Sequence, residues 1–318
     1  MKIKLTRIVL FLCIGITSYA QSKTQHEWYL SLLPKIKNEV PPMLRTSWGQ
    51  NAPYHNQCPL APQKSVHCKT GCVATAMAQV MKYYAYPARG TGSISYQYKG
   101  DDNQQYTVTA DFGQSVYDWQ NMKDSYSPIK NATQQQKEAV AKLMADCGAA
   151  VKMQYGQYDS GAFDMDIPNA MKTYFGYDPS ISYLSSFDEP TDSLWFTTLY
   201  QQLSDGMPVI YGGSTESYLL HSFVVDGYNS EGKFHVVYGL GGNDGYVDIR
   251  DIRFKYGQSM IYNIRPPKTT GIEHPLQPAR EATEQARFLL DGTRIATPQR
   301  GLNIVKMSDG SVKKIVVR

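Results

Sequence analysis

The stretch TGCVATAMAQVMKYY, from Thr70 to Tyr84, places a glycine and a cysteine at the start of a run rich in alanine. Pro87 ends the helical pattern, so we expect a helix over residues 72–84 with Cys72 in its first turn. Unpaired N–H groups at a helix N-terminus stabilise a thiolate, and Gly71 lets the backbone turn sharply beside the sulfur. This pattern fits a buried structural thiol as well as a nucleophile, and the rest of the chain has to distinguish the two.

A nucleophilic thiol needs a base, and the histidines are the first side chains to consider. Of the six in the chain, only His221 and His235 fall in the strand-rich second half. His221 opens the predicted strand HSFVVDGY, from which its ring can point into a cleft between two lobes. Upstream, the loop SWGQNAPY carries Gln50, whose amide can donate a hydrogen bond to an oxyanion. The order Gln50, Cys72, His221 is the papain arrangement.

The distribution of helical and strand patterns predicts an α+β protein with two lobes, one helical and one an antiparallel, barrel-like sheet. The first half carries helical patterns over 72–84, 133–148 with Thr133 as its cap, 164–175 and 193–204, and a strand pair over 94–112. After Gly206, short strands alternate with glycine-rich turns up to Pro266 and Pro267. A small β-rich tail is expected over residues 286–318, with turns at Asp291-Gly292 and Ser308-Asp309-Gly310.

The residue pattern divides the chain into four segments. Residues 1–20 read as a secretory signal peptide, because Lys2, Lys4 and Arg7 precede a short apolar run and a small-residue cleavage site ending at Ala20. Residues 21–45 form a short N-terminal segment or pro-segment, 46–266 the main domain, and 267–318 a linker and β-rich tail. We therefore expect a secreted protein, located outside the cell, on its surface or in the periplasm. Leu12 before Cys13 is too bulky for a good lipoprotein cleavage site.

The charge distribution argues against a nucleic-acid partner. The net charge of +4 comes from the two ends of the chain, since residues 300–318 alone hold five basic residues against one acidic residue. The body between them is acidic overall, which does not suit phosphate binding. No segment after the signal is long and apolar enough to span a membrane.

Four cysteines follow the signal: Cys58, Cys68, Cys72 and Cys147. An even number in a secreted chain permits two disulfides, or one bridge with a free nucleophile and a buried thiol. A bridge between Cys58 and Cys68 would close a short loop. His55 and His67 lie close by in the sequence, but the spacing fits no standard zinc pattern, so we expect neither a metal nor another cofactor.

Several motifs together resemble the streptopain family of secreted bacterial cysteine peptidases, which have a papain-like fold. The shared stretches are WGQNAPYHNQCP (48–59), TGCVATAMAQVMKYYAYP (70–87), YDWQNM (117–122), LMADCGAAVKMQYG (143–156), SGAF (160–163) and HSFVVDGY (221–228). The resemblance covers roughly Trp48 to Tyr262, and its longest string is specific.

The resemblance implies a site and a reaction. Carried over by motif, Cys72 is the nucleophile, His221 the general base and acid, and Gln50 the oxyanion donor of an endopeptidase acting on proteins or peptides. The substrate-binding residues it implies are Gly71, Ser160, Gly161, Ala162, Leu220 and Tyr238. Cys147 falls at a structural helix position and His235 in a strand.

Two departures from the family pattern bear on activity. The family motif H-V-N-W-G-W-G-G reads HVVYGLGG here, so Val237, Tyr238 and Leu240 replace an asparagine and two tryptophans. Valine cannot form a hydrogen bond with an imidazole ring. A backbone carbonyl, Tyr238 or a polar group such as Asn243 must therefore orient His221, and we expect reduced peptidase activity.

The second departure is the short segment before the main domain, since only 27 residues separate Ala20 from Trp48. This leaves no room for a domain-sized inhibitory prodomain, so latency would come from a short pro-segment or a separate inhibitor protein.

Two further functions remain open on the sequence. A pseudopeptidase would use the same fold as a binding module, and HVVYGLGG is the feature that favours it. A thiol amidase or transpeptidase would use the same two side chains on a non-protein amide. The C-terminal stretch resembles β-rich tails that some Gram-negative bacteria use for secretion or surface sorting, and a plain hairpin is the alternative.

Overall fold

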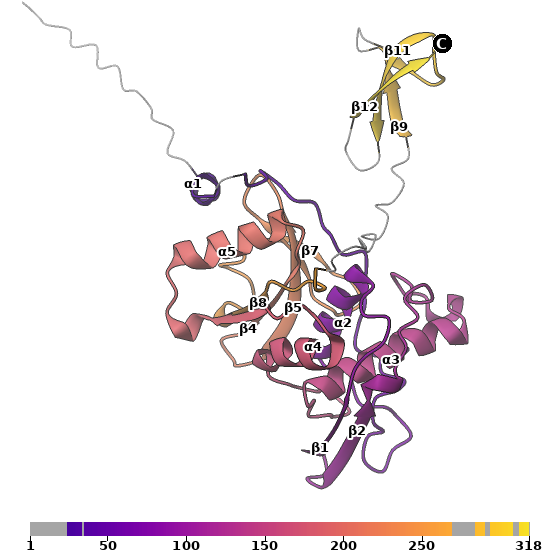
Figure 1. The fold of residues 1–318 in the computed structure, drawn as a ribbon, viewed down its shortest axis with the longest axis vertical. Coiled ribbons are helices and arrows are strands. Elements are labelled where there is room, and N and C mark those ends of the chain that lie inside the picture. Colours follow the sequence, from indigo (N-terminus) through magenta and orange to yellow (C-terminus); the bar gives the residue numbers. More distant parts are fainter. Residues whose placement is uncertain (1–23, 34, 269–283, 290–292, 308–311, 318) are drawn as a thin grey trace, which may run out of the picture.

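The computed structural model describes residues 24–268, 284–289, 293–307 and 312–317, apart from residue 34. The expected signal peptide, most of the linker-like stretch over 268–285 and both predicted tail turns lie mainly or wholly outside the described residues. Two layers of helices enclose an antiparallel sheet (Figure 1). This confirms the α+β class.

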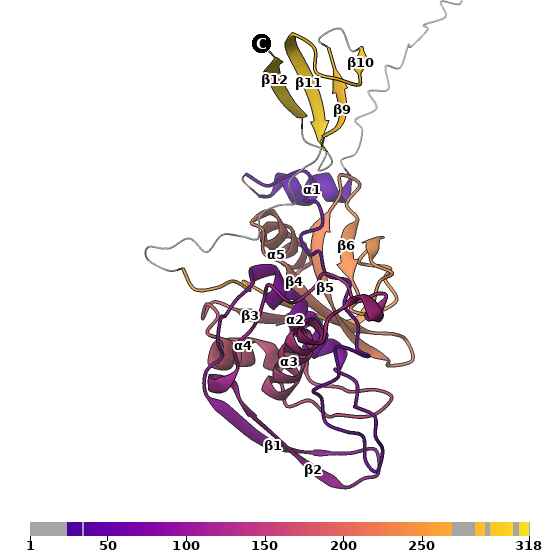
Figure 2. The same ribbon diagram turned by 90° about the vertical axis from the view of Figure 1, so that its right-hand side faces the viewer.

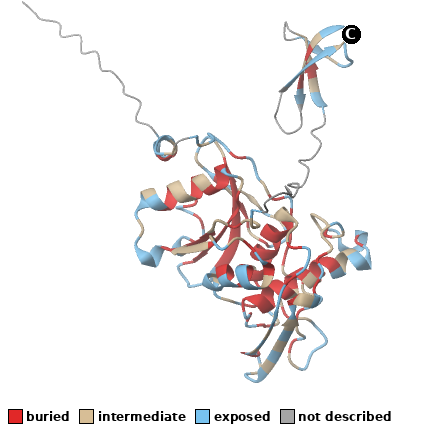
Figure 3. Ribbon diagram, in the orientation of Figure 1, coloured by how far each residue is buried: buried red, intermediate tan, exposed pale blue. Residues whose placement is uncertain are grey.

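The main sheet has six strands, and every neighbouring pair is antiparallel. In spatial order they are β3 (Ser182–Ser185), β8 (Tyr256–Tyr262), β4 (Val209–Ser214), β5 (Leu220–Tyr228), β6 (Phe234–Val237) and β7 (Gly245–Val247). The two central strands, β4 and β5, are buried on both faces except at Leu220 (Figure 3). Residues of β5 alternate between two cores, since Val224 joins one and Phe223 and Val225 the other.

The first core lies among the helices that follow the cysteine motif. It contains α2 (Cys72–Tyr84), α3 (Gln134–Ala150) and α4 (Ile167–Phe175). Thr133 caps α3 as predicted, through a capping box with Gln136. A ribbon of β1 (Ser93–Lys99) and β2 (Gln105–Asp111) extends from this lobe (Figure 2). Short 3-10 turns occur at Phe112–Gln114, Ile129–Asn131, Asp164–Asp166 and Ser186–Asp188.

The second core lies on the opposite face of the sheet. There α5 (Asp192–Ser204) packs over β4 and β5, and α1 (Gln25–Ser31) packs against α5. His26 of α1 is buried, and its Nδ1 lies 3.0 Å from the Tyr200 hydroxyl. Further along, Val40 pairs with Tyr228 at the end of β5. The segment before residue 46 therefore packs on this lobe.

The C-terminal strands form a separate four-stranded sheet. Its order is β10 (Arg294–Ile295), β9 (Glu284–Phe288), β11 (Gly301–Met307) and β12 (Val312–Val317). Arg287 is buried within this unit and donates to Asn303 at 3.2 Å. The β-rich tail expected from the sequence is thus present. In the described part of the chain, no helix has both the length and the apolar character that crossing a membrane requires.

Candidate active site

Cys72 is the first residue of α2, and the turn before it can only be made by a small residue. Gly71 has φ +81°, in the left-handed region, and a Cβ there would lie 2.7 Å from the Met153 sulfur and 2.9 Å from the Ser160 carbonyl oxygen. Thr75 ties the first turn together, since its hydroxyl donates to the Gly71 carbonyl at 2.9 Å. The sulfur is therefore held at the helix N-terminus, as the sequence predicted.

Burial and hydrogen bonding act in opposite directions on the Cys72 thiol. Burial raises its pKa, and the backbone N–H of Ser222, followed by weaker contributions from Val73 and Cys72 itself, opposes this. The Asp159 carboxylate raises the pKa of Cys72 further, because a negative charge disfavours the thiolate. Ser222 directly follows His221, so β5 brings both the base and an N–H donor to the sulfur.

His221 is the second residue of β5, and its ring is almost fully enclosed. Its Nε2 lies 2.9 Å from the backbone carbonyl oxygen of Tyr238. A carbonyl only accepts hydrogen bonds, so Nε2 carries the proton and Nδ1 is left as the basic nitrogen. The ring packs against Phe254, with 4.9 Å between centroids, and burial lowers the pKa of His221.

The carbonyl of Tyr238 is one of the three orienting groups that the sequence left open. Asn243 is exposed, and no hydrogen bond joins it to His221 in the described chain, while Val237 is buried in the core and pairs with Val224. The valine therefore has a packing role, and the base is oriented without an asparagine.

One cleft of about 430 Å³ brings the predicted catalytic residues together. Its lining includes Gln50, Cys72 and His221, which are separated by up to 171 positions in the sequence. Leu220, predicted to contact substrate, also lines it and is 73% exposed. We call this the central cleft. The remaining lining residues are Asn51, Lys69, Tyr158, Asp159, Leu219, Leu240, Arg253 and Phe254.

The other residues predicted to bind substrate lie outside the lining of the central cleft. The Ser160 side chain is buried and bonds back to Gly156, closing the loop beside Gly71. Gly161 pairs through its backbone with Gln154, and Ala162 packs against the first core. Tyr238 contributes its carbonyl to His221. None of these residues, nor Gly71, is among those lining the central cleft within the described chain.

Sequence reasoning missed the charged groups of the cleft. Asp159 and Arg253 act on His221 in opposite directions, the carboxylate raising its pKa and the guanidinium lowering it. Asp159 immediately precedes the SGAF motif, which is the one signal that could have identified it. Arg253 lies in a loop before β8 that carries no recognisable motif.

Three other cysteines of the described chain, and His235, do not line the central cleft. Cys58, Cys68 and Cys147 are buried free thiols, and burial raises the pKa of Cys68 to about 11. His235 Nδ1 lies 2.6 Å from the carboxylate of buried Asp226, within the fold of the second lobe. Among the described residues, no cluster of three or more histidine, cysteine or acidic side chains could hold a metal.

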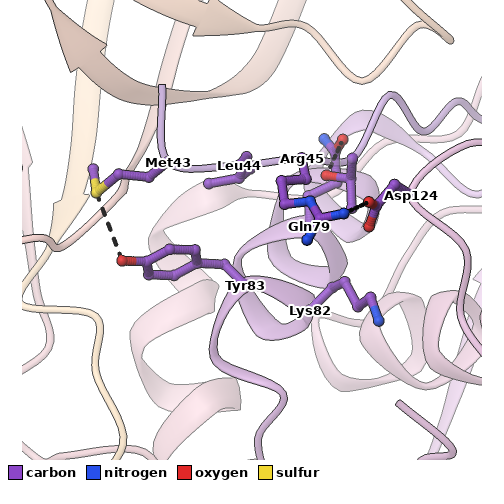
Figure 4. Close-up of a pocket in the computed structure, with 8 residues that line it drawn as sticks. Met43, Leu44, Arg45, Gln79, Lys82, Tyr83 and Asp124 are labelled. Carbon is purple, nitrogen blue, oxygen red and sulfur yellow. Dashed lines mark hydrogen bonds and ion pairs between the residues drawn. The ribbon is translucent and has the colours of Figure 1, made fainter. Parts of the chain in front are cut away.

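A small hollow on another side of α2 anchors the chain that leads to Gln50. Figure 4 shows Met43 reaching the Tyr83 hydroxyl and Arg45 pointing to Asp124, with which it forms a 2.8 Å ion pair. Gln79 of α2 accepts hydrogen bonds from the Thr46 hydroxyl and the Trp48 backbone N–H, at 3.0 and 3.3 Å. The helix that begins with the thiol therefore also fixes the segment before Gln50.

A thiol at the start of a helix and an imidazole on an antiparallel sheet, meeting in one cleft between two lobes, define the class of papain-like cysteine peptidases. Residues 48–247 match the model of the peptidase C10 family, and the chain belongs to that family. It is 40% identical to interpain A, a cysteine protease of Prevotella intermedia, with a TM-score of 0.64 over 71% of this chain and 95% of that structure.

Curated relatives agree with this assignment. The chain is 34% identical to streptopain of Streptococcus pyogenes over 57% of its own length and 45% of that protein. It is 31% identical to the thiol protease/hemagglutinin PrtT of Porphyromonas gingivalis, over 65% of its own length and 24% of that protein. The chain thus matches less than half of either curated relative.

Proposed function

We propose that this protein is a secreted cysteine endopeptidase that cleaves protein substrates through a thioester on Cys72. The observation that carries the proposal is the meeting of Gln50, Cys72 and His221 in the central cleft. The signal-like N-terminus supports export to the cell surface, the medium or the periplasm. Latency would come from a short pro-segment or from a separate inhibitor protein.

The first half of the reaction forms the thioester. Burial raises the pKa of Cys72 and lowers that of His221, so at neutral pH the proton resides on sulfur. His221 Nδ1 takes this proton as the sulfur attacks the substrate carbonyl carbon. The Gln50 amide and the Cys72 backbone N–H stabilise the resulting oxyanion. His221 then protonates the leaving amine, and the C–N bond breaks.

The second half of the reaction releases the acid product. Water loses a proton to His221 Nδ1 and attacks the thioester carbonyl, and the C–S bond then breaks. The proton returns from His221 to the sulfur. No cofactor takes part in any of these steps. The Tyr238 carbonyl keeps Nδ1 available in both halves. His221 thus has an orienting partner although Val237 replaces the asparagine, which weakens the feature that favoured the pseudopeptidase alternative.

The experiment is hydrolysis of denatured casein by the secreted chain and its variants. Cys72→Ala should abolish hydrolysis while leaving the unfolding temperature nearly unchanged, because the side chain acts as nucleophile. Cys147→Ala is the matched control, since it removes a thiol buried in α3 against Met81 and should retain hydrolysis. Full activity in Cys72→Ala would rule out the proposal.

Gln50 is tested in the same assay. Gln50→Ala should lower kcat by roughly ten- to a thousandfold, because one oxyanion donor is lost, with a much smaller change in KM. A change confined to KM would mean that Gln50 only contacts substrate.

A further inference from the structure

The loop from Tyr238 to Asp244 touches three separate parts of the proposed site. Its Tyr238 carbonyl accepts the hydrogen bond from His221. Its Gly241 N–H donates to the Trp48 carbonyl at 2.9 Å, two residues before Gln50. Gly239 packs so closely on α2 that a Cβ there would lie 2.9 Å from the Thr75 side chain. The same loop therefore contacts the proposed base, the segment that carries the proposed oxyanion donor, and the helix that carries the proposed nucleophile.

The backbone of this Tyr238–Asp244 loop adopts an uncommon conformation. Gly239, Gly241, Gly242 and Asn243 all have positive φ, at 69°, 84°, 127° and 66°. Such a run is flexible in the unfolded chain, so other contacts must select one conformation. The closing contact is the Asp244 carboxylate, whose Oδ1 accepts the Tyr238 backbone N–H at 2.9 Å.

The two hydrogen bonds at Tyr238 flank the same Cα. The Asp244 carboxylate accepts a hydrogen bond from the Tyr238 N–H on one side, and the Tyr238 carbonyl accepts one from the His221 ring on the other. With the N–H released, the peptide groups of Tyr238 can rotate, and Gly239 offers little resistance to such rotation. Loss of the Asp244 hydrogen bond would therefore change the orientation of the His221 imidazole, because the Tyr238 carbonyl that binds the ring would move.

We propose that Asp244 is a positioning residue for His221, acting through the Tyr238 backbone. The inference rests on the proposed function for its catalytic consequence, but its structural part stands on the two hydrogen bonds. Asp244 is half-buried and lies close enough to Asp226 and His235 to interact with both charges. It touches neither the thiol nor the central cleft in the described chain.

Asp244→Ala and Asp244→Asn separate the hydrogen bond from the charge. Asparagine keeps a side-chain oxygen that can accept a hydrogen bond from the Tyr238 N–H, whereas alanine has no acceptor. Asp248→Ala is the matched control, because Asp248 also caps a backbone N–H, that of Arg250 at 3.0 Å, without lining the central cleft. The titratable groups around His221 are Cys72, Asp159, Arg253 and Tyr238, and none of them is substituted in these variants.

The first measurement needs no activity. An NMR titration of the His221 ring, assigned with His221→Asn, should give a lower midpoint in Asp244→Ala, because the carbonyl that favours the protonated ring is no longer held. Asp244→Asn and Asp248→Ala should titrate like the wild type. An unchanged midpoint in Asp244→Ala would overturn the inference, even if its unfolding temperature falls.

The second measurement is casein-peptide hydrolysis. We expect kcat of Asp244→Ala to fall by about tenfold, a part of the roughly 10²–10⁴-fold that a positioned acid–base group contributes, with KM changed by less than about twofold. If Asp244→Asn is as impaired as Asp244→Ala, charge rather than positioning is responsible and the inference fails. If the wild type is inert but the titration still shifts, the proposed function fails and the positioning role stands.

Discussion

At the scale of single residues, burial favours a neutral Cys72 thiol beside a neutral His221 ring, because it raises the pKa of the first and lowers that of the second. Asp159, which lines the central cleft, acts on both groups. Its carboxylate raises the pKa of Cys72 and also that of His221. A charge outside the motifs quoted for the family resemblance therefore acts on both groups.

Asp159→Asn tests this adjustment. Removing the negative charge should lower the pKa of Cys72, so iodoacetamide should alkylate it faster at pH 7 and the midpoint of the pH–rate curve should fall. The pKa of His221 should fall as well, because the same charge stabilises its protonated ring. Asp159 is exposed, so the difference between variant and wild type should shrink at high salt.

The comparison for this titration is Asp205→Asn, an exposed aspartate at the end of α5 that does not line the central cleft. It should leave the alkylation curve unchanged. An Asp159→Asn curve that coincides with the wild-type curve at low salt would show that Asp159 does not act on the thiol.

At the scale of elements, a buried carboxylate joins the N-terminal segment to the main sheet. Asp226 of β5 is fully buried, and its two carboxylate oxygens bind His235 Nδ1 at 2.6 Å and the Leu44 backbone N–H at 2.7 Å. Leu44 lies in the segment that leads to Gln50. The Asp226 carboxylate therefore contributes to stability and helps to place the segment before Gln50, and it does not line the central cleft in the described chain.

Asp226→Ala should destabilise the protein by about 2–5 kcal/mol, because it leaves the half-buried His235 imidazole and the buried Leu44 N–H without their acceptor, at roughly 1–3 kcal/mol each. Urea unfolding followed by tryptophan fluorescence measures the change. Asp251→Ala breaks an exposed pair with Lys255 and should leave the midpoint nearly unchanged. Equal midpoints for the two variants would contradict this account.

Elements with local signals were predictable from the sequence, and those defined by distant partners were not. The helix over 72–84 and the Thr133 cap are confirmed because a glycine start, a proline stop and a capping box are local features. Strand β3 was not predicted, since Ser182–Ser185 is short and becomes a strand only by pairing with β8. The group bonded to His221 Nε2 is a backbone carbonyl, which leaves no side-chain signature, so the sequence could not select it over the Tyr238 side chain or Asn243.

At the scale of the whole molecule, the chain contains a peptidase body and a C-terminal sheet with its own buried Arg287–Asn303 contact. We predict that a chain ending at Pro267 folds with the unfolding temperature and casein hydrolysis of the full chain, because both cores of the body lie before that residue. Insoluble truncated protein would mean that the tail belongs to the core. Normal export of the truncated chain would exclude a sorting role for the tail.

The most direct test of the account is the mapping of a peptidyl epoxide, a covalent inhibitor of thiol peptidases, by mass spectrometry on the purified protein. Of the four cysteines in the described chain, only Cys72 is incompletely buried and lines the central cleft. We predict one adduct, on Cys72, formed in step with the loss of casein hydrolysis and strongly slowed in His221→Ala. Modification of Cys58, Cys68 or Cys147 instead, or undiminished hydrolysis after complete modification of Cys72, would contradict the central claim.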